Sequence, residues 1–150
     1  MSYEIKQDGK FKFIEEGEGE PLLLLHGLFG ALSNFQFLIE HFRKTNKVIV
    51  PLLPLLELDL LHTSVGGLQK FVHRFIEHRN YNNINLLGNS LGGHVALVHI
   101  LKNPERIKSL ILTGSSGLFE NGICETYPKR DDKDYNHKKT ELTFYDPAMA

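Results

Sequence analysis

The stretch that decides the fold runs from residue 83 to residue 94 and reads Asn-Ile-Asn-Leu-Leu-Gly-Asn-Ser-Leu-Gly-Gly-His. Its apolar first half predicts a buried strand, and the segment from about Leu91 to Lys102 predicts a helix that ends before a proline. Between these elements, glycines stand two residues before and two residues after Ser90. In a nucleophile elbow a serine occupies such a strand-to-helix turn, and its small neighbours leave the hydroxyl exposed. The spacing therefore predicts Ser90 as a catalytic nucleophile; the alternative is a glycine-rich turn in which the serine only caps the helix.

A second segment, His26-Gly27-Leu28-Phe29-Gly30, follows the apolar run Leu22 to Leu25. An oxyanion that develops when a serine attacks a carbonyl needs two N–H donors aimed at one point. We expect one donor to be the N–H of Leu91 and the other to be the N–H of Leu28, because the glycines let this loop approach a substrate closely. His26 precedes the serine, whereas the base follows it in this arrangement. We therefore interpret His26 as a structural residue that orients the loop.

The rest of the chain alternates predicted strands and helices up to residue 113. Further strands are predicted at Lys10 to Glu15, Asn46 to Val50 and Ile107 to Thr113, and further helices at Ser33 to Phe42 and Ser64 to His78. A short run that is apolar at every position, such as Leu22 to Leu25, is typical of a strand buried on both faces of a parallel sheet. The sequence thus predicts an α/β protein, a three-layer α/β/α sandwich with a mostly parallel sheet.

The composition is that of an ordinary globular protein. Of the 150 residues 41% are hydrophobic and 23% are charged, and the formal net charge is -1. This balance predicts neither nucleic acid nor a membrane as a partner. The one cysteine cannot form an internal disulfide, and the N-terminus has no apolar signal segment, so we expect a cytoplasmic protein. No cluster has the spacing of metal ligands, so no metal and no cofactor is expected.

Three motifs in order resemble the α/β-hydrolase fold family. They are Leu-Leu-Leu-Leu-His-Gly-x-x-Gly from residue 22, Gly-Asn-Ser-Leu-Gly-Gly-His from residue 88, and Ile-x-Ser-Leu-Ile-Leu-Thr-Gly from residue 107. The resemblance covers about residues 11 to 119 and is closest to bacterial members that hydrolyse ester, thioester or carbon–carbon bonds. It implies Ser90 as the nucleophile, with Leu28 and Leu91 as backbone donors. A serine at this place argues against the dehalogenase and epoxide-hydrolase branches, which use aspartate. One departure is the segment Pro51 to Leu56, which lacks the glycine of the Asp-x-x-Gly turn of many relatives.

The order of the catalytic triad in this fold is Ser, then Asp or Glu, then His. The turn that follows the strand Ile107 to Thr113 has no carboxylate. Later candidates lie in a polar segment that no core strand fixes: Asp131, Asp132, Asp134 and His137. Among the other histidines, His94 is interpreted as a packed residue, and His73 and His78 as solvated. We therefore expect the acid and the base beyond residue 150, and a fold that is incomplete at its C-terminal end.

Two functions remain open at this point. The first is hydrolysis of a small apolar ester or related acyl substrate through an acyl-Ser90 intermediate. We expect apolar side chains at the mouth of its pocket: Leu28, Phe29, Leu118 and Phe119. The second is a non-catalytic hydrolase remnant that serves as a fold fragment or an interaction module. In either case we expect residues 1–117 to form the N-terminal part of the core and residues 118–150 to begin a lid insertion.

The strand predicted at Ile107 to Thr113 has a further property. It is apolar, carries one charge and contains no proline. In the family, two further strands flank it, and without them it becomes the edge of the sheet. An exposed edge of this kind pairs with other chains. We therefore expect the 150-residue chain to self-associate.

Overall fold

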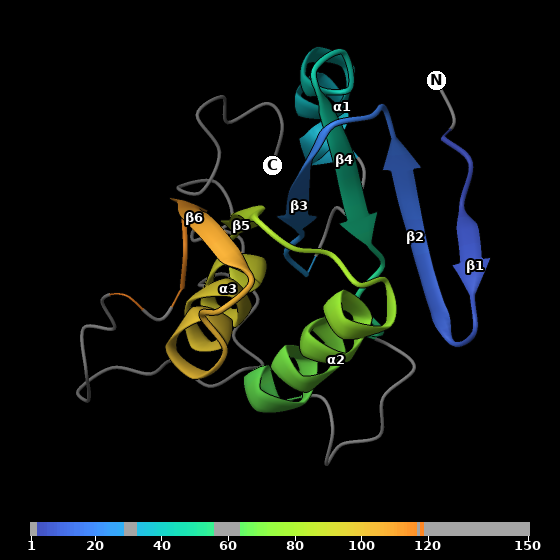
Figure 1. Ribbon diagram of the computed structural model, residues 1–150. Helices are drawn as coiled ribbons and strands as arrows, with labels where there is room; N and C mark the ends of the chain where they lie inside the picture. Colours follow the sequence, from blue (N-terminus) through green and yellow to red (C-terminus); the bar gives the residue numbers. More distant parts are fainter. Residues whose placement is uncertain (1–2, 29–32, 56–63, 117, 119–150) are drawn as a thin grey trace, which may run out of the picture. The chain divides into compact units, whose positions relative to one another are not determined.

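The computed structural model describes residues 3–28, 33–55, 64–116 and 118 (Figure 1). These residues belong to the first of the two units into which the chain divides, Met1–Phe119. The expectations for Phe29, Phe119 and the lid, apart from Leu118, therefore lie outside the described residues.

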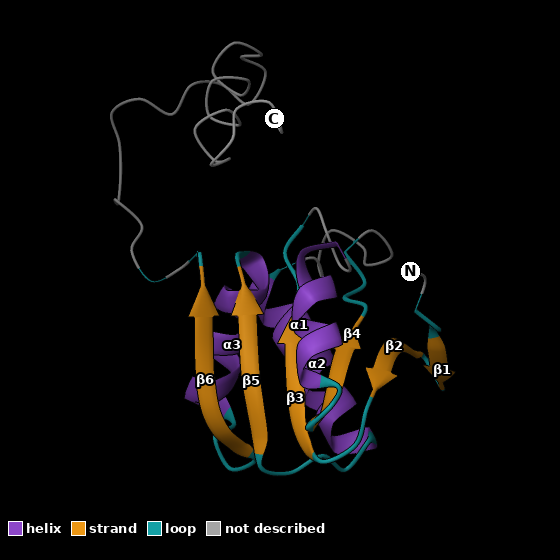
Figure 2. Ribbon diagram, turned by 90° about the horizontal axis from the view of Figure 1, so that it is seen from above, coloured by secondary structure: helices purple, strands orange, loops and turns teal. Residues whose placement is uncertain are grey.

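The described part is built on one six-stranded sheet (Figure 2). Its strands are β1 (Lys6–Asp8), β2 (Phe11–Glu16), β3 (Glu20–Leu25), β4 (Asn46–Pro51), β5 (Ile84–Asn89) and β6 (Ile107–Thr113). Their order across the sheet is β1-β2-β4-β3-β5-β6. Strands β4, β3, β5 and β6 are parallel, whereas β2 is antiparallel to β4 and β1 is antiparallel to β2. The prediction of a mostly parallel sheet is confirmed.

Helices cover both faces of this sheet (Figure 1). Helix α1 (Gln36–Phe42) lies on one face, and α2 (Val65–His78) and α3 (Leu91–Lys102) lie on the other. Alternate side chains of β3 point to opposite faces, so Leu22 and Leu24 pack with α1 while Leu23 and Leu25 pack in the core of α2 and α3. This is why β3 is apolar at four consecutive positions. The predicted three-layer sandwich is confirmed.

One local prediction was wrong, and one strand was missed. The α-helix predicted from Ser33 begins at Gln36, because Ser33–Phe35 form a turn of 3-10 helix. Strand β1 was not predicted, because its sequence Lys-Gln-Asp has no apolar side chain to mark a strand. It pairs with β2 through a turn at Gly9, where φ is 58° and glycine is unstrained.

A polar cluster joins the β1–β2 hairpin to the end of α2. The Arg79 guanidinium donates to Asp8 Oδ2 at 2.8 Å, to Glu15 Oε2 at 3.3 Å and to the Tyr81 hydroxyl at 3.2 Å. Tyr81 in turn donates to Glu15, and burial together with this bond raises the pKa of the Tyr81 hydroxyl. His78 Nε2 lies 2.9 Å from the other oxygen of Asp8. Asp8 and Glu15 of the hairpin are therefore bound to the end of α2 and the residues that follow it.

Strand β6 is the last strand of the sheet within the described residues. Its side chains are half-buried or exposed, and Ile111 keeps 44% of its surface accessible. None of the helices described is long and apolar enough to cross a membrane.

Candidate active site

Ser90 occupies the single residue between the end of β5 and the start of α3. Its backbone has φ 54° and ψ -120°, a conformation that residues other than glycine rarely adopt. The side chain is exposed and forms no cap hydrogen bond to α3. The predicted sharp turn between a strand and a helix is confirmed. The alternative, in which Ser90 only caps the helix, requires a hydrogen bond from its side chain to α3, and that bond is not formed.

Gly88 and Gly92, two residues before and after Ser90, lie so close to other backbone atoms that a side chain does not fit at either position. A Cβ at Gly88 would lie 2.5 Å from the carbonyl oxygen of Gly92. A Cβ at Gly92 would overlap the carbonyl of Leu25 and lie 2.7 Å from that of His26. Helix α3 therefore begins in direct contact with the end of β3, and only glycine fits at this crossing.

The loop after β3 passes beside the Ser90 hydroxyl. A Cβ at Gly27 would lie 3.1 Å from Ser90 Cβ and 3.4 Å from Ser90 Oγ. Leu28, the next residue, has a side chain that is 60% exposed. Leu91 follows Ser90 as the first residue of α3. Leu28 and Leu91, the two expected oxyanion donors, thus directly follow Gly27 and Ser90, which lie against each other. That their N–H groups point to one place stays a prediction.

His26 is buried and fixes this loop. Its Nδ1 lies 2.8 Å from the carbonyl oxygen of Gly27, and its Nε2 accepts a hydrogen bond of 3.0 Å from the N–H of Leu53. Both bonds are made together only by the neutral ring with its proton on Nδ1. Burial lowers the pKa of His26 and keeps it neutral. These contacts agree with the structural role expected for His26.

Protonation of His26 is expected to reduce folding stability. The folded pKa lies below the unfolded value of about 6.5, so the stabilisation is complete above that pH and decreases as the pH falls, by up to about 1.4 kcal/mol per pH unit. Urea unfolding of the wild type at pH 7.5 and pH 5 should show this loss, and His26→Asn should reduce it. His41→Asn, a change of an exposed histidine on α1, should leave the pH dependence as it is in the wild type. An equal loss of stability between pH 7.5 and pH 5 in the wild type and both variants would contradict the conclusion that His26 is buried in its neutral form.

A turn after β6 supports the backbone of Ser90, which sequence reasoning missed. The N–H of Ser90 donates to the carbonyl of Thr113 at 3.1 Å, and the N–H of Ser116 donates to the carbonyl of Ser90 at 3.3 Å. A Cβ at Gly93 would meet the Ser115 hydroxyl at 2.6 Å. Because strained backbone persists only where its surroundings fix it, residues 113–116 help to hold Ser90 in place.

No acid or base accompanies Ser90 within the described residues. None of their side chains hydrogen-bonds to its hydroxyl. His94 is half-buried on α3, in line with a packed residue. His73 and His78 are not simply solvated, since they lie 3.4 Å from Glu77 and 2.9 Å from Asp8. The downstream candidates Asp131, Asp132, Asp134 and His137 lie outside the described residues.

One further histidine was not singled out from the sequence. His99 lies between α3 and α2, and burial first, then the nearby His73, lower its pKa to about 4. Its Nδ1 lies 3.4 Å from Gln69 Nε2. His99 therefore packs two helices together and takes no part in the site.

One family model matches more than half of the chain. It is described as alpha/beta hydrolase fold and covers residues 61–142. The chain belongs to the alpha/beta hydrolase fold family. The resemblance drawn from the three sequence motifs is therefore confirmed.

Individual members of the alpha/beta hydrolase family are similar at moderate identity. Lipase 1 of Psychrobacter immobilis is 31% identical over 121 residues, which are 76% of this chain and 38% of the lipase. The 2-hydroxymuconate semialdehyde hydrolase of Pseudomonas sp. (strain CF600) is 27% identical over 118 residues, 69% of this chain and 39% of that enzyme. A solved structure, the alpha/beta hydrolase enzyme MGS-MChE2 from a sediment metagenome of the lagoon of Mar Chica, Morocco, has a TM-score of 0.73 and 49% identity over 78% of this chain and 54% of its own. The chain spans about two fifths of the length of these curated relatives.

Proposed function

We propose that this chain carries the nucleophile part of a serine hydrolase that cleaves an ester or a related acyl bond. The conformation of Ser90 supports this most strongly. Ser90 is exposed, has φ 54° and makes no cap hydrogen bond, so its side chain does not stabilise α3. Glycine would adopt the same backbone conformation without strain. Strain of this kind is found where a side chain must be presented for chemistry.

The reaction would proceed through an acyl-enzyme. Ser90 Oγ attacks the carbonyl carbon and its proton passes to a base, so an Oγ–C bond forms and the oxygen becomes an oxyanion. The N–H groups of Leu28 and Leu91 are proposed to hold that oxyanion. Collapse breaks the bond to the alcohol, which leaves with the proton, and water then releases the acid and restores Ser90. In this proposal the base and its acid lie outside the described residues.

The proposed substrate has an apolar acyl group. Leu28, which follows the Gly27 that lies beside Ser90, is 60% exposed, and Leu118, two residues after the Ser116 that is bonded to Ser90, is 59% exposed. Exposed leucines at these positions suit an acyl chain better than a polar group. The lipases among the relatives support an ester as the bond that is cleaved.

Slow, Ser90-dependent turnover is the expected result for the 150-residue chain. With no base on Ser90, hydrolysis of p-nitrophenyl butyrate should run at least about a thousandfold below that of a complete triad. Mass spectrometry should detect a butyryl adduct on the peptide that contains Ser90. Ser90→Ala should remove both the adduct and the turnover above background.

The matched control is Ser109→Ala, on the neighbouring strand β6. Ser109 donates to Asn85 Oδ1 at 2.7 Å and plays no part in the proposed chemistry. Its variant should keep the adduct. An adduct on another residue, or none at all, would overturn the proposal and favour the non-catalytic remnant. Rapid Ser90-dependent turnover would place an acid and a base among the residues of this chain that lie outside the described part.

A further inference from the structure

The carbonyl oxygen of Ser90 accepts a hydrogen bond from outside the helix that it begins. The N–H groups of Gly93 and His94, both in α3, donate to it at 3.0 and 3.2 Å. A third N–H, that of Ser116 in the turn after β6, donates to it at 3.3 Å. The Ser116 hydroxyl also lies 3.5 Å from this oxygen. The turn after β6 is thus bonded directly to the peptide group that joins Ser90 to Leu91.

This peptide group also carries the N–H of Leu91, which is one of the two proposed oxyanion donors. The peptide bond is trans and planar, so its C=O and its N–H point in opposite directions. Holding the Ser90 carbonyl toward Ser116 therefore fixes the direction of the Leu91 N–H. Leu91 is the first residue of α3, where the helix itself supplies no acceptor for an N–H. Hydrogen bonds accepted by the carbonyl also polarise the peptide group and make its N–H a stronger donor.

Gly114 shapes the turn that brings Ser116 back to Ser90. Its φ is 53°, in the left-handed region, and a Cβ there would have no described neighbour nearer than Asn89 Oδ1, at 3.9 Å. Glycine is therefore needed here for its backbone conformation and not for space. A β-branched residue is strongly disfavoured at positive φ, whereas asparagine tolerates it. A substitution at this position can thus alter the turn without a side chain that touches Ser90.

We propose that Gly114 and Ser116 are positioning residues for the hydrolysis. Through the bond from the Ser116 N–H, they orient and polarise the peptide group that presents the Leu91 N–H to the oxyanion. This inference rests on the proposed function, because it concerns an oxyanion donor of the same site. Removing an oxyanion-hole donor lowers kcat by about 10²–10³-fold. A disturbed turn leaves the donor present but less well oriented, so the expected loss is smaller, about tenfold.

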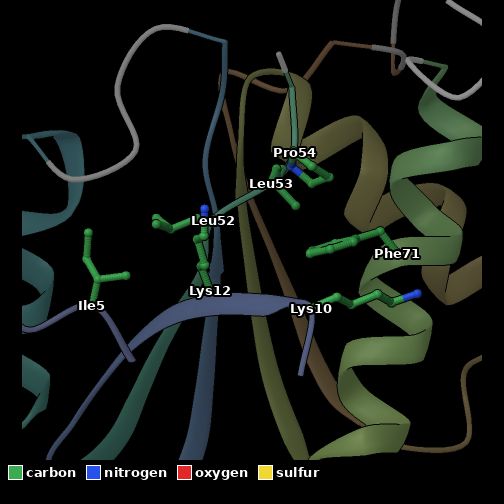
Figure 3. A pocket seen from close by; sticks show the side chains of 7 residues that line it. All are labelled: Ile5, Lys10, Lys12, Leu52, Leu53, Pro54 and Phe71. Carbon is green, nitrogen blue, oxygen red and sulfur yellow. The ribbon is translucent and has the colours of Figure 1, made fainter. Parts of the chain in front are cut away.

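Gly9 offers a control with the same backbone conformation away from the site. Its φ is 58°, and a Cβ there would meet no described atom within 4 Å. It lies in the turn between β1 and β2, at the opposite edge of the sheet from β6. The cavity of about 290 Å³ at this hairpin includes neither Gly9 nor Ser90 (Figure 3); it is lined by Ile5, Lys10, Lys12, Leu52, Leu53, Pro54 and Phe71. A valine at Gly9 should therefore cost stability, as at Gly114, without reaching Ser90.

Acylation of Ser90 by p-nitrophenyl butyrate, followed by mass spectrometry in the 150-residue chain, tests the proposal. Gly114→Val should lower the maximal acylation rate about tenfold. The ester concentration at half the maximal rate should change less than about twofold, because the ester binds before the oxyanion forms. Gly114→Asn should restore the rate, and Gly9→Val should keep it. Ser116→Pro, which lacks the N–H, should reproduce the loss.

The NMR signal of the Leu91 amide gives a second measurement that needs no ester. Its nitrogen shift should move in Gly114→Val and in Ser116→Pro but not in Gly9→Val, because only the first two change the bonding of the Ser90 carbonyl. A wild-type rate in Gly114→Val, an equal loss in Gly9→Val or an unmoved Leu91 signal would overturn this inference and leave the proposed function standing. The absence of an adduct on wild-type Ser90 would overturn the proposed function, and this inference with it.

Discussion

Gly92→Ala is expected to lower the free energy of unfolding by about 3 kcal/mol or to prevent folding. The added Cβ would overlap the carbonyl of Leu25 and lie 2.7 Å from that of His26, and both are backbone groups of a buried strand end. Neither can move unless α3 separates from β3. Urea unfolding followed by circular dichroism measures the loss.

Gly66→Ala is the matched control for this change. Gly66 lies in the first turn of α2, and among the described residues outside the helix backbone a Cβ there would meet the Ser64 hydroxyl at 3.8 Å, an ordinary contact distance. Alanine also restricts the unfolded chain, so this variant should be unchanged or more stable by about 0.5 kcal/mol. Equal effects of the two substitutions would show that α3 does not begin in contact with β3.

The 150-residue chain is expected to form dimers that dissociate on dilution. Strand β6 is the last strand of the described sheet, Ile111 on it is 44% exposed, and its one lysine, Lys108, is paired with Glu20 of β3 at 2.7 Å. Antiparallel pairing of two copies about Leu110 would place Lys108 opposite Leu112 and Ser109 opposite Ile111. No like charges meet in that register, so the edge is complementary to itself. Light scattering on a size-exclusion column should give twice the chain mass at tens of micromolar protein.

Ile111→Lys should shift this equilibrium to the monomer, because a lysine on an edge strand opposes pairing. Phe37→Lys makes a similar change at a side chain on α1 that is 88% exposed, away from the edge, and should leave the dimer intact. A wild-type chain that remains monomeric at the highest concentrations would mean that β6 is covered by residues outside the described part.

Much of the fold could be predicted because the decisive signals are local in the sequence. The apolar run Leu22–Leu25 indicated a strand buried on both faces, and the glycines around Ser90 indicated the turn that the structure shows. The parts that were missed depend on residues far apart in the chain. Arg79 meets Asp8 across 71 positions, and Ser116 meets Ser90 across 26, so neither contact leaves a periodic pattern to find. The oxyanion donors and the triad partners depend on such long-range geometry in the same way.

The strained backbone of Ser90 sets stability against side-chain chemistry at this position. Glycine adopts φ 54° and ψ -120° without strain, so a chain under selection for thermal stability alone would gain from losing the serine side chain here. Retaining a hydroxyl at this point opposes that gain, in the manner of a trade-off between stability and activity. Under the proposed function, position 90 is a place where the most stable version of this protein and the most reactive version would have different sequences.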